Sequence, residues 1–273
     1  MFRVQHIENL DLTELLPYRT MRQSQEHRQQ GIFVAEGEKV VRRLLESDFT
    51  VVSVLLPDKW LAAFEPWLRA RPEKEIPVYV ATEKRVLEQL TGFSMFQGVL
   101  AVGKIPVRLS LPQILERTAP PRLLVAVEGL TNAENLGALV RNAAAFHVQA
   151  LIVGETSGSP FLRRAVRNSM GTIFQLPVAE TSSLVASLRE LRRQGIRCIA
   201  AHPRAQGRTL SQANFAGDCC IVFGSEGYGI TTAALQACDD AVAIPMPPKV
   251  DSLNVGSAAA VFLYEANRQR GRL

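Results

Sequence analysis

Three short segments in the second half of the 273-residue sequence join glycines and polar side chains in patterns that suit a binding site. The first runs from Glu128 to Gly137, and Arg141 follows Asn135 by about one and a half helical turns. An amide and a guanidinium near the start of one helix can bind a common ligand. An Asn cap followed by a solvated Arg is the structural alternative, and this segment alone leaves both interpretations open.

The second segment follows an apolar run and places three glycines around Glu226, in the order G-x-x-G-x-G from Gly224 to Gly229. Glycine lets a ligand approach the backbone closely. Dinucleotide-binding loops have the order G-x-G-x-x-G, and a carboxylate inside the loop would repel a pyrophosphate. The phosphate-binding pattern G-x-x-x-x-G-K-[ST] is also absent from the sequence. The loop therefore favours a ligand without phosphate and disfavours a nicotinamide-dependent dehydrogenase.

The third segment begins with Ile244-Pro245-Met246 and ends at Ser252 and Asn254. These two polar residues immediately precede a run of small and apolar residues with helical period. N-capping explains one of them but leaves the rest of the loop without a structural reason. The segment is therefore a second place where a ligand can contact the chain just before a helix.

Alternating strand-like and helical patterns position these segments. The strand-like runs are Leu123–Val127, Ala150–Val153, Arg197–Ala201, Cys219–Phe223 and Ala241–Ile244, and the clearest helical patterns are Asn135–Phe146 and Ser182–Gln194. Such alternation predicts an α/β fold with a parallel sheet that is covered on both faces. Ligands bind at the carboxyl ends of parallel strands, and each of the three segments follows a strand.

The first part of the chain predicts a separate, small α/β domain. Strand, helix and strand are expected at Ile32–Ala35, Glu38–Leu45 and Val51–Leu56, followed by a strand at Pro77–Val80, a helix at Glu83–Leu90 and a strand at Gly98–Val102. A proline-punctuated stretch follows. We therefore assign residues 1–105 to a first domain, 106–120 to a linker and 121–273 to a second domain.

Charge is distributed unevenly along the chain, whose net charge is +5. Residues 1–105 carry 14 basic and 14 acidic side chains, whereas the remainder carries 17 and 12, and 16 of those 17 are arginine. Arginine matches phosphate oxygens and stacks on bases, so nucleic acid is a candidate partner, with a solvated arginine-rich surface as the alternative. Within the first domain, Arg19, Arg22 and Arg28 lie among glutamines and form a candidate RNA contact, or the face of a solvated helix.

Several classes of protein are disfavoured by composition. The sequence has no apolar run long enough to span a membrane and no basic start followed by an apolar stretch, so we expect a soluble, cytoplasmic protein. The four cysteines and four histidines do not have the spacing of zinc ligands, and we expect buried thiols and no metal site.

In this order and at these distances, the three segments resemble the motifs of the SpoU family of knotted SPOUT methyltransferases, over about residues 123–268. The motif N-x-G-x-x-x-R is matched from Asn135 to Arg141, G-x-E-G-x-G from Gly224 to Gly229, and I-P-M with S-L-N-V from Ile244 to Met246 and from Ser252 to Val255. The chain has Asn132-Ala133 where the family usually has Asp-Pro. The segment Phe33–Gly37 is similar to part of the ribosomal-protein-like substrate-binding domain that precedes many SpoU catalytic domains.

The resemblance implies an enzyme that methylates a ribose 2′-hydroxyl in RNA with S-adenosylmethionine, with ribosomal RNA favoured over transfer RNA. It also implies a homodimer and a trefoil knot in the second domain, whose loops hold the cofactor. The resemblance also implies that Gly224, Ile244 and Leu253 bind the cofactor and that Arg141 lies beside the reactive hydroxyl. We assign Asn135, Glu226, Ser252 and Asn254 to the catalytic site together with Arg141.

The chemistry of arginine suggests how Arg141 acts. A guanidinium keeps its proton, so it is a poor general base, but it is well suited to bind a phosphate and to stabilise negative charge on the reacting oxygen. We expect Glu226 to hold this guanidinium as an ion pair, and Asn135, Ser252 and Asn254 to complete the hydrogen bonding. A catalytically inactive RNA-binding protein on the same fold is the alternative function, and loss of Arg141 or Glu226 would indicate it; both are present.

Overall fold

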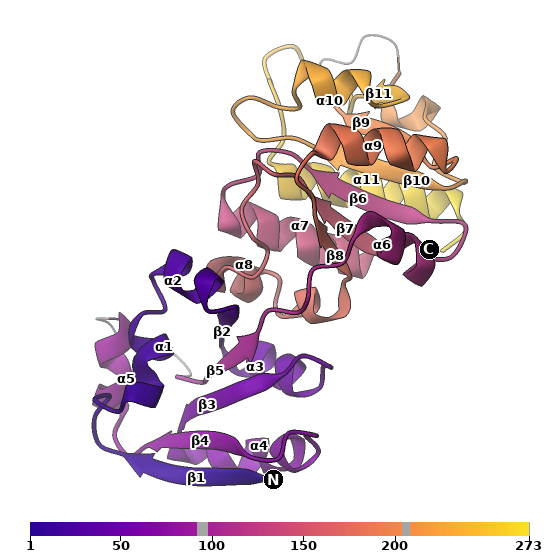
Figure 1. Cartoon of the computed structure of the whole chain (residues 1–273). Coiled ribbons are helices and arrows are strands. Elements are labelled where there is room, and N and C mark those ends of the chain that lie inside the picture. The colour runs from indigo at the N-terminus through magenta and orange to yellow at the C-terminus, as the bar shows by residue number, and fades with distance from the viewer. Residues whose placement is uncertain (92–97, 204–207, 273) are drawn as a thin grey trace. The chain divides into compact units, whose positions relative to one another are not determined.

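The chain folds into two compact units. Figure 1 shows the structure, a computed structural model, with its termini and its main helices and strands labelled. The structure describes residues 1–91, 98–203 and 208–272. The first unit comprises Met1–Val107 and Phe161–Phe174, and the second comprises Arg108–Pro160 and Gln175–Leu273. The chain therefore passes between the units at residues 107–108, 160–161 and 174–175.

The first unit is built on a mixed five-stranded sheet. Its strands are β1 (Phe2–Ile7), β2 (Ile32–Glu36), β3 (Val51–Pro57), β4 (Ile76–Ala81) and β5 (Leu100–Lys104), in the spatial order β1-β4-β3-β5-β2. Strands β1 and β3 pair parallel with β4, whereas β5 is antiparallel to both β3 and β2. The predicted strand–helix–strand unit therefore exists, with β5 inserted between its two strands.

Helices surround this sheet. They are η1 (Thr13–Leu15), α1 (Leu16–Arg19), α2 (Ser24–Gln29), α3 (Glu38–Leu45), η2 (Asp58–Trp60), α4 (Leu61–Arg69), α5 (Lys84–Thr91), α8 (Arg163–Asn168) and η3 (Thr172–Gln175). Helix α3 has the bounds that its periodicity predicts, because Val41 and Leu44 bury one face while Arg42 and Glu46 lie on the other. Tyr18 of α1 is fully buried, and its hydroxyl shares a 2.8 Å hydrogen bond with that of Ser53 on β3.

The segment from Phe161 to Phe174 packs in the first unit, although the sequence places it in the second domain. The rings of Phe161 and Phe174 lie 5.9 and 5.5 Å from that of Phe33 on β2. Arg163 and Arg167 of α8 both donate to the buried carboxylate of Glu36. The sequence-based division at residues 105–121 does not include this segment, because its partners lie more than a hundred residues away in the sequence.

The second unit contains a six-stranded sheet that is parallel throughout. Its strands are β6 (Leu123–Val127), β7 (Ala150–Val153), β8 (Val178–Glu180), β9 (Arg197–Ala201), β10 (Cys219–Phe223) and β11 (Asp240–Val242), in the order β11-β9-β10-β6-β7-β8. The predicted parallel α/β sheet is confirmed. Strand β11 ends two residues earlier than expected, which leaves Ile244 in the following loop.

Helices cover both faces of this sheet. They are α6 (Leu111–Arg117), α7 (Ala133–Ala145), α9 (Leu184–Arg193), η4 (Leu210–Gln212), α10 (Thr232–Gln236) and α11 (Val255–Gln269). On one face, Ile114, Leu188 and Ala234 of α6, α9 and α10 share a core with the strands. On the other, Phe262 of α11 packs edge-on against Phe223. Because α6 is part of this core, the stretch from residue 108 to 120 belongs to the second unit and differs from the expected linker.

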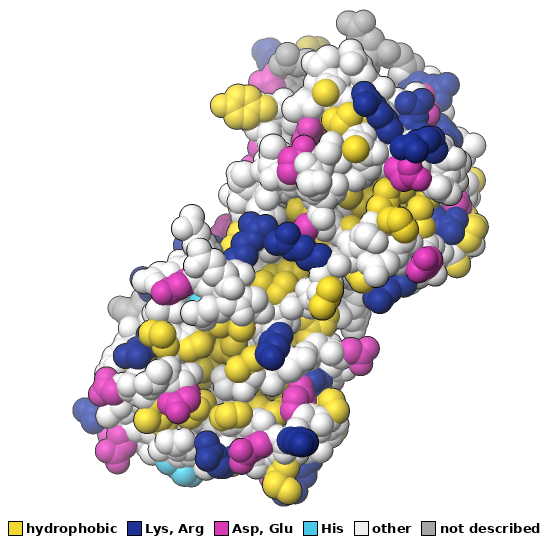
Figure 2. All heavy atoms as spheres, in the orientation of Figure 1, with side chains coloured by type: hydrophobic (Ala, Val, Ile, Leu, Met, Phe, Trp, Pro, Cys, Tyr) yellow, Lys and Arg dark blue, Asp and Glu magenta, His cyan; other side chains and the backbone are white. Residues whose placement is uncertain are grey.

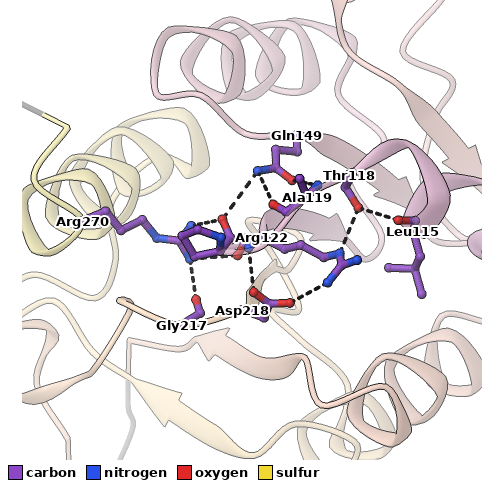
Figure 3. Close-up of polar contacts among 9 residues, drawn as sticks. Leu115, Thr118, Ala119, Arg122, Gln149, Gly217, Asp218 and Arg270 are labelled. Carbon is purple, nitrogen blue, oxygen red and sulfur yellow. Dashed lines mark hydrogen bonds and ion pairs between the residues drawn. The ribbon is translucent and has the colours of Figure 1, made fainter.

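A cluster of polar contacts fixes the end of α11 to the beginnings of β6 and β10 (Figure 3). The guanidinium of Arg270 donates to the carbonyl oxygens of Phe215, Arg122 and Gly217, at 2.8, 2.8 and 2.6 Å. Arg122 in turn pairs with Asp218 at 2.8 Å. These contacts satisfy the hydrogen-bonding capacity of carbonyl groups that precede β6 and β10. The last residues of α11 are therefore anchored at the amino-terminal ends of these strands.

No helix in the described part of the chain has both the length and the apolar composition needed to cross a membrane. The four cysteines are free thiols, of which three are buried. Burial raises the pKa of each of them, and the pKa of Cys238 rises to about 12. Thiolates are the reactive form of cysteine, so these side chains are structural.

Candidate cofactor pocket and catalytic cluster

A cavity of about 390 Å³ opens in the second unit at the carboxyl ends of β9, β10 and β11. Its walls are Ala201–Pro203 after β9, Phe223–Gly229 after β10, Val242, Ile244 and Met246 around the end of β11, and Asp251–Leu253, Val255, Ala258 and Phe262 from the last loop and α11. This is the sheet edge at which parallel α/β folds bind ligands. The second and third segments identified in the sequence therefore meet in one pocket.

The glycine-rich loop is closed upon itself. The backbones of Ser225 and Gly229 exchange two hydrogen bonds, of 3.1 and 2.9 Å. A Cβ atom at Gly224 would clash with the backbone of Gly229 and Ile230, and Gly229 itself has a positive φ of 69°. These two positions therefore need glycine for the shape of the loop. At Gly224 the close neighbour is the loop's own backbone.

Asn254 connects the three segments. Its Oδ1 accepts hydrogen bonds from the backbone amides of Gly256 and Ser257 and so caps α11. Its Nδ2 donates to Asn135 Oδ1 at 3.0 Å and to Glu226 Oε1 at 2.8 Å. One side chain therefore serves as the helix cap and also joins the start of α7 to the glycine-rich loop.

The cap of α7 is Asn132 rather than Asn135. Asn132 Oδ1 accepts from the amides of Glu134 and Asn135, at 2.8 and 3.2 Å. The amide side chain of Asn135 is therefore available for Asn254. The capping role of Asn132 also shows that this loop is anchored, although the chain has Asn132-Ala133 in place of the Asp-Pro pair expected from the family resemblance.

Arg141 stands apart from this cluster. Its side chain is exposed on α7, and among the described residues it takes part in no hydrogen bond or ion pair. The expected ion pair between Glu226 and Arg141 is thus replaced by the contact of Glu226 with Asn254. The guanidinium is free to meet a group that approaches from solvent.

The other predicted site residues fall in two places. Gly224, Ile244 and Leu253, predicted to bind the cofactor, all line the cavity, as do Glu226 and Ser252. The predicted RNA contacts Arg19, Arg22 and Arg28 are exposed in the first unit. They lie on or beside two short helices, α1 and α2, rather than on one solvated helix, and buried Met21 and His27 fix this segment to the unit.

The lining residues that sequence reasoning did not assign to the site include His202, Tyr228 and Met246. His202 directly follows β9, whose bounds the sequence predicts, so the rule that ligands bind at strand ends could have found it. Met246 belongs to a quoted motif, but its side-chain direction depends on the loop's path. Tyr228 lies inside the glycine-rich loop, and its exposure is visible only in the structure.

The side chains around the cavity suit a positively charged ligand that carries no phosphate group. Glu226 and Asp251 contribute carboxylates, whereas Phe223, Val242 and Phe262 contribute apolar wall. The described residues contain no group of His, Cys, Asp and Glu side chains arranged to bind a metal. A ligand with positive charge and an apolar body would fit these surroundings, whereas a pyrophosphate would be repelled.

Comparisons with known proteins show the family of the chain. A model of the SpoU rRNA Methylase family matches residues 122–264. An uncharacterized tRNA/rRNA methyltransferase of Mycobacterium tuberculosis is 36% identical, over 87% of this chain and 81% of that protein. The 23S rRNA (guanosine-2′-O-)-methyltransferase RlmB of Vibrio vulnificus is 34% identical, over 68% of this chain and 76% of the enzyme.

The fold has a counterpart among solved structures. An AdoMet-bound rRNA methyltransferase from Sinorhizobium meliloti superposes with a TM-score of 0.83 at 21% identity, covering 97% of this chain and 98% of that one. The chain therefore shares the fold of that structure. The chain belongs to the SpoU rRNA methylase family, which confirms the family and the class of enzyme that the three motifs predict.

Proposed function

We propose that this RNA methyltransferase transfers a methyl group from S-adenosylmethionine to a ribose 2′-hydroxyl, in ribosomal RNA rather than transfer RNA. The observation that carries the proposal is the meeting of the three segments: two of them line one cavity, and Asn254 joins both to Asn135 of the first. The 2′-O-specificity named for the Vibrio vulnificus relative supports the choice of the ribose hydroxyl.

S-adenosylmethionine supplies an electrophilic methyl group when it is bound. The chain's own contribution is to bind and orient the two reactants. Gly224, Ile244 and Leu253 line the cavity at positions where main-chain groups can contact the adenosyl part. The cavity's volume of about 390 Å³ lies within the usual range for small-molecule sites. Its carboxylates favour a sulfonium over a phosphate-bearing nucleotide.

Arg141 is the proposed electrostatic catalyst. Its exposed guanidinium can bind the phosphate beside the reactive ribose and stabilise negative charge as the 2′-oxygen loses its proton. Glu226 and Asn135 are positioned by Asn254, and with Ser252 they offer acceptors and donors around the ribose. In-line methyl transfer depends strongly on such positioning, which is worth up to about 7–11 kcal/mol in favourable cases.

The proposed enzyme is a homodimer that binds RNA through its first unit. The family resemblance supports a homodimer, in which Arg141 acts within one chain or across to the other, and a trefoil knot formed by the loops around the cofactor. The first unit, with Arg19, Arg22 and Arg28 exposed, is the proposed RNA-binding domain. Figure 2 shows a further gathering of Lys and Arg side chains over α9 of the second unit, where Arg189, Arg192 and Arg193 are exposed.

The decisive experiment maps 2′-O-methylated nucleotides in total RNA from cells with and without this gene. We expect one or a few ribosomal RNA positions to lose their methyl group in the deletion and to regain it with the wild-type gene. Complementation with Arg141→Ala should fail. An unchanged methylation map, together with RNA binding by the purified protein, would instead identify an inactive RNA-binding protein on this fold.

A further inference from the structure

Tyr228 is the most exposed aromatic side chain in the described part of the second unit. Its exposed fraction is 98%, and it lies at the rim of the cavity in the loop between β10 and α10. Among the residues that the structure describes, the hydrogen bond to Tyr228 is made by its backbone, whose amide donates to Ser225 Oγ at 3.1 Å. A ring so exposed contributes nothing to the core, so packing does not account for it.

The loop that carries Tyr228 is anchored at both ends. Ser225 and Gly229 are paired with each other across it. Directly after it, the amide and hydroxyl of Thr231 both donate to the carboxylate of Glu128, each at 2.8 Å. The point from which the ring projects is therefore fixed before any ligand binds. A partner that contacts the ring does not have to order the loop, which lowers the entropic cost of binding.

Charge at the rim indicates which part of a nucleotide can contact it. Glu226 precedes Tyr228 by two residues, and both it and Asp251 are exposed carboxylates at the cavity. A phosphate would be repelled here, whereas the face of a base would not. An aromatic ring is the side chain on which bases stack, with little dependence on sequence.

We propose that Tyr228 is a positioning residue of the methyl transfer: a base of the RNA at or next to the reactive ribose stacks on its ring. This inference rests on the proposed function, because the reactive ribose must reach the cavity mouth for its hydroxyl to meet the methyl donor. The attached base then lies at the rim, where Tyr228 projects. The stack fixes the nucleotide, and the hydroxyl of Tyr228 has no part in it.

The test compares Tyr228→Ala, Tyr228→Leu and Tyr228→Phe with the wild type. The full-length protein methylates total RNA from cells lacking the gene, with radiolabelled S-adenosylmethionine as donor. We expect Tyr228→Ala and Tyr228→Leu to raise the KM for RNA about tenfold, in the range for loss of one stacked base. Tyr228→Phe should behave as the wild type, and the KM for S-adenosylmethionine should stay within about twofold in all three. Thermal unfolding serves as the folding control, because so exposed a side chain should not affect it.

The outcomes separate this inference from the proposed function. A wild-type protein that fails to methylate this RNA overturns the function and the inference together. An active wild type whose Tyr228→Ala variant keeps its KM for RNA overturns the inference alone. An increase confined to the KM for S-adenosylmethionine would place the ring on the cofactor, and a changed oligomeric state in light scattering would place it against another protein chain; both contradict base stacking. Equal losses in Tyr228→Phe and Tyr228→Ala would contradict it as well.

Discussion

We predict that the stability with which residues 161–174 pack in the first unit depends strongly on the carboxylate of Glu36. Its side chain is only 9% exposed, and that of its partner Arg163 is 17% exposed, whereas the second partner, Arg167, is 61% exposed. Replacing Glu36 by alanine would leave Arg163 largely buried without its counter-charge. Breaking a buried pair in this way costs about 3–5 kcal/mol, whereas an exposed pair contributes at most about 1 kcal/mol.

Hydrogen exchange followed by mass spectrometry measures this effect locally. In Glu36→Ala, we expect the protection of peptides from residues 161–174 to fall by at least about a hundredfold, equivalent to about 3 kcal/mol. Peptides from β10 in the second unit should keep their protection. Arg167→Ala is the matched control, because it removes the exposed partner of the same carboxylate and should lower protection less than about fivefold.

Two results would refute this reasoning. Unchanged protection of residues 161–174 in Glu36→Ala would show that the carboxylate does not hold the segment in the first unit. An equal loss in Arg167→Ala would show that burial does not determine which of the two ion pairs matters. A double-mutant cycle of Glu36 with each arginine, measured by the same exchange, separates the pairwise terms.

Three further predictions concern the second unit. Arg141→Ala should abolish methyl transfer while calorimetry shows S-adenosylmethionine affinity within about tenfold, or 1.4 kcal/mol, of the wild type; equal loss of both would indicate a structural role. Gly224→Ala should abolish S-adenosylmethionine binding, because its Cβ collides with the backbone of Gly229 and Ile230, and retained binding would contradict that account of the loop. Burial raises the pKa of Cys238 from 9.0 to about 12, so the folded state keeps a proton that the unfolded chain loses above about pH 9. This contribution to the free energy of unfolding is present below pH 9 and is lost as the pH rises toward 12. In urea unfolding, the stability of Cys238→Ala should therefore decline less between about pH 9 and 11 than that of the wild type. An identical decline would exclude the thiol as its source.

The sheet of the second unit could be predicted closely because of how its strands are buried. Strands covered on both faces are continuous apolar runs, and the bounds of β6, β7, β9 and β10 are those that the runs predict. Strands β1 and β8 were missed. Strand β1 lies at the edge of its sheet, and polar, exposed residues interrupt its apolar ones. Strand β8 has only three residues. Neither pattern is distinctive without its neighbours.

The site was predictable in its residue types and less so in its contacts. The resemblance placed Gly224, Ile244 and Leu253 at the cofactor, and all three line the cavity. The partner of Glu226 differs from the expected one, because Asn254 lies 28 positions away and reaches it only through the path of the last loop. Spacing within a segment describes one helix or turn, whereas a contact between segments depends on the whole fold.

The membership of residues 161–174 in the first unit also has a consequence for synthesis on the ribosome. Residues 1–107 leave the ribosome well before Phe161 and Phe174 do, and ribosomes add about 5–20 residues per second. During that interval of several seconds, the ring of Phe33 has no Phe161 or Phe174 to cover it, and the carboxylate of Glu36 has neither of its arginines. The nascent first unit therefore exposes an apolar, acidic patch on β2 until residues 108–160 of the second unit and the segment 161–174 have been translated. Synthesis of the second unit therefore begins before the first unit is complete.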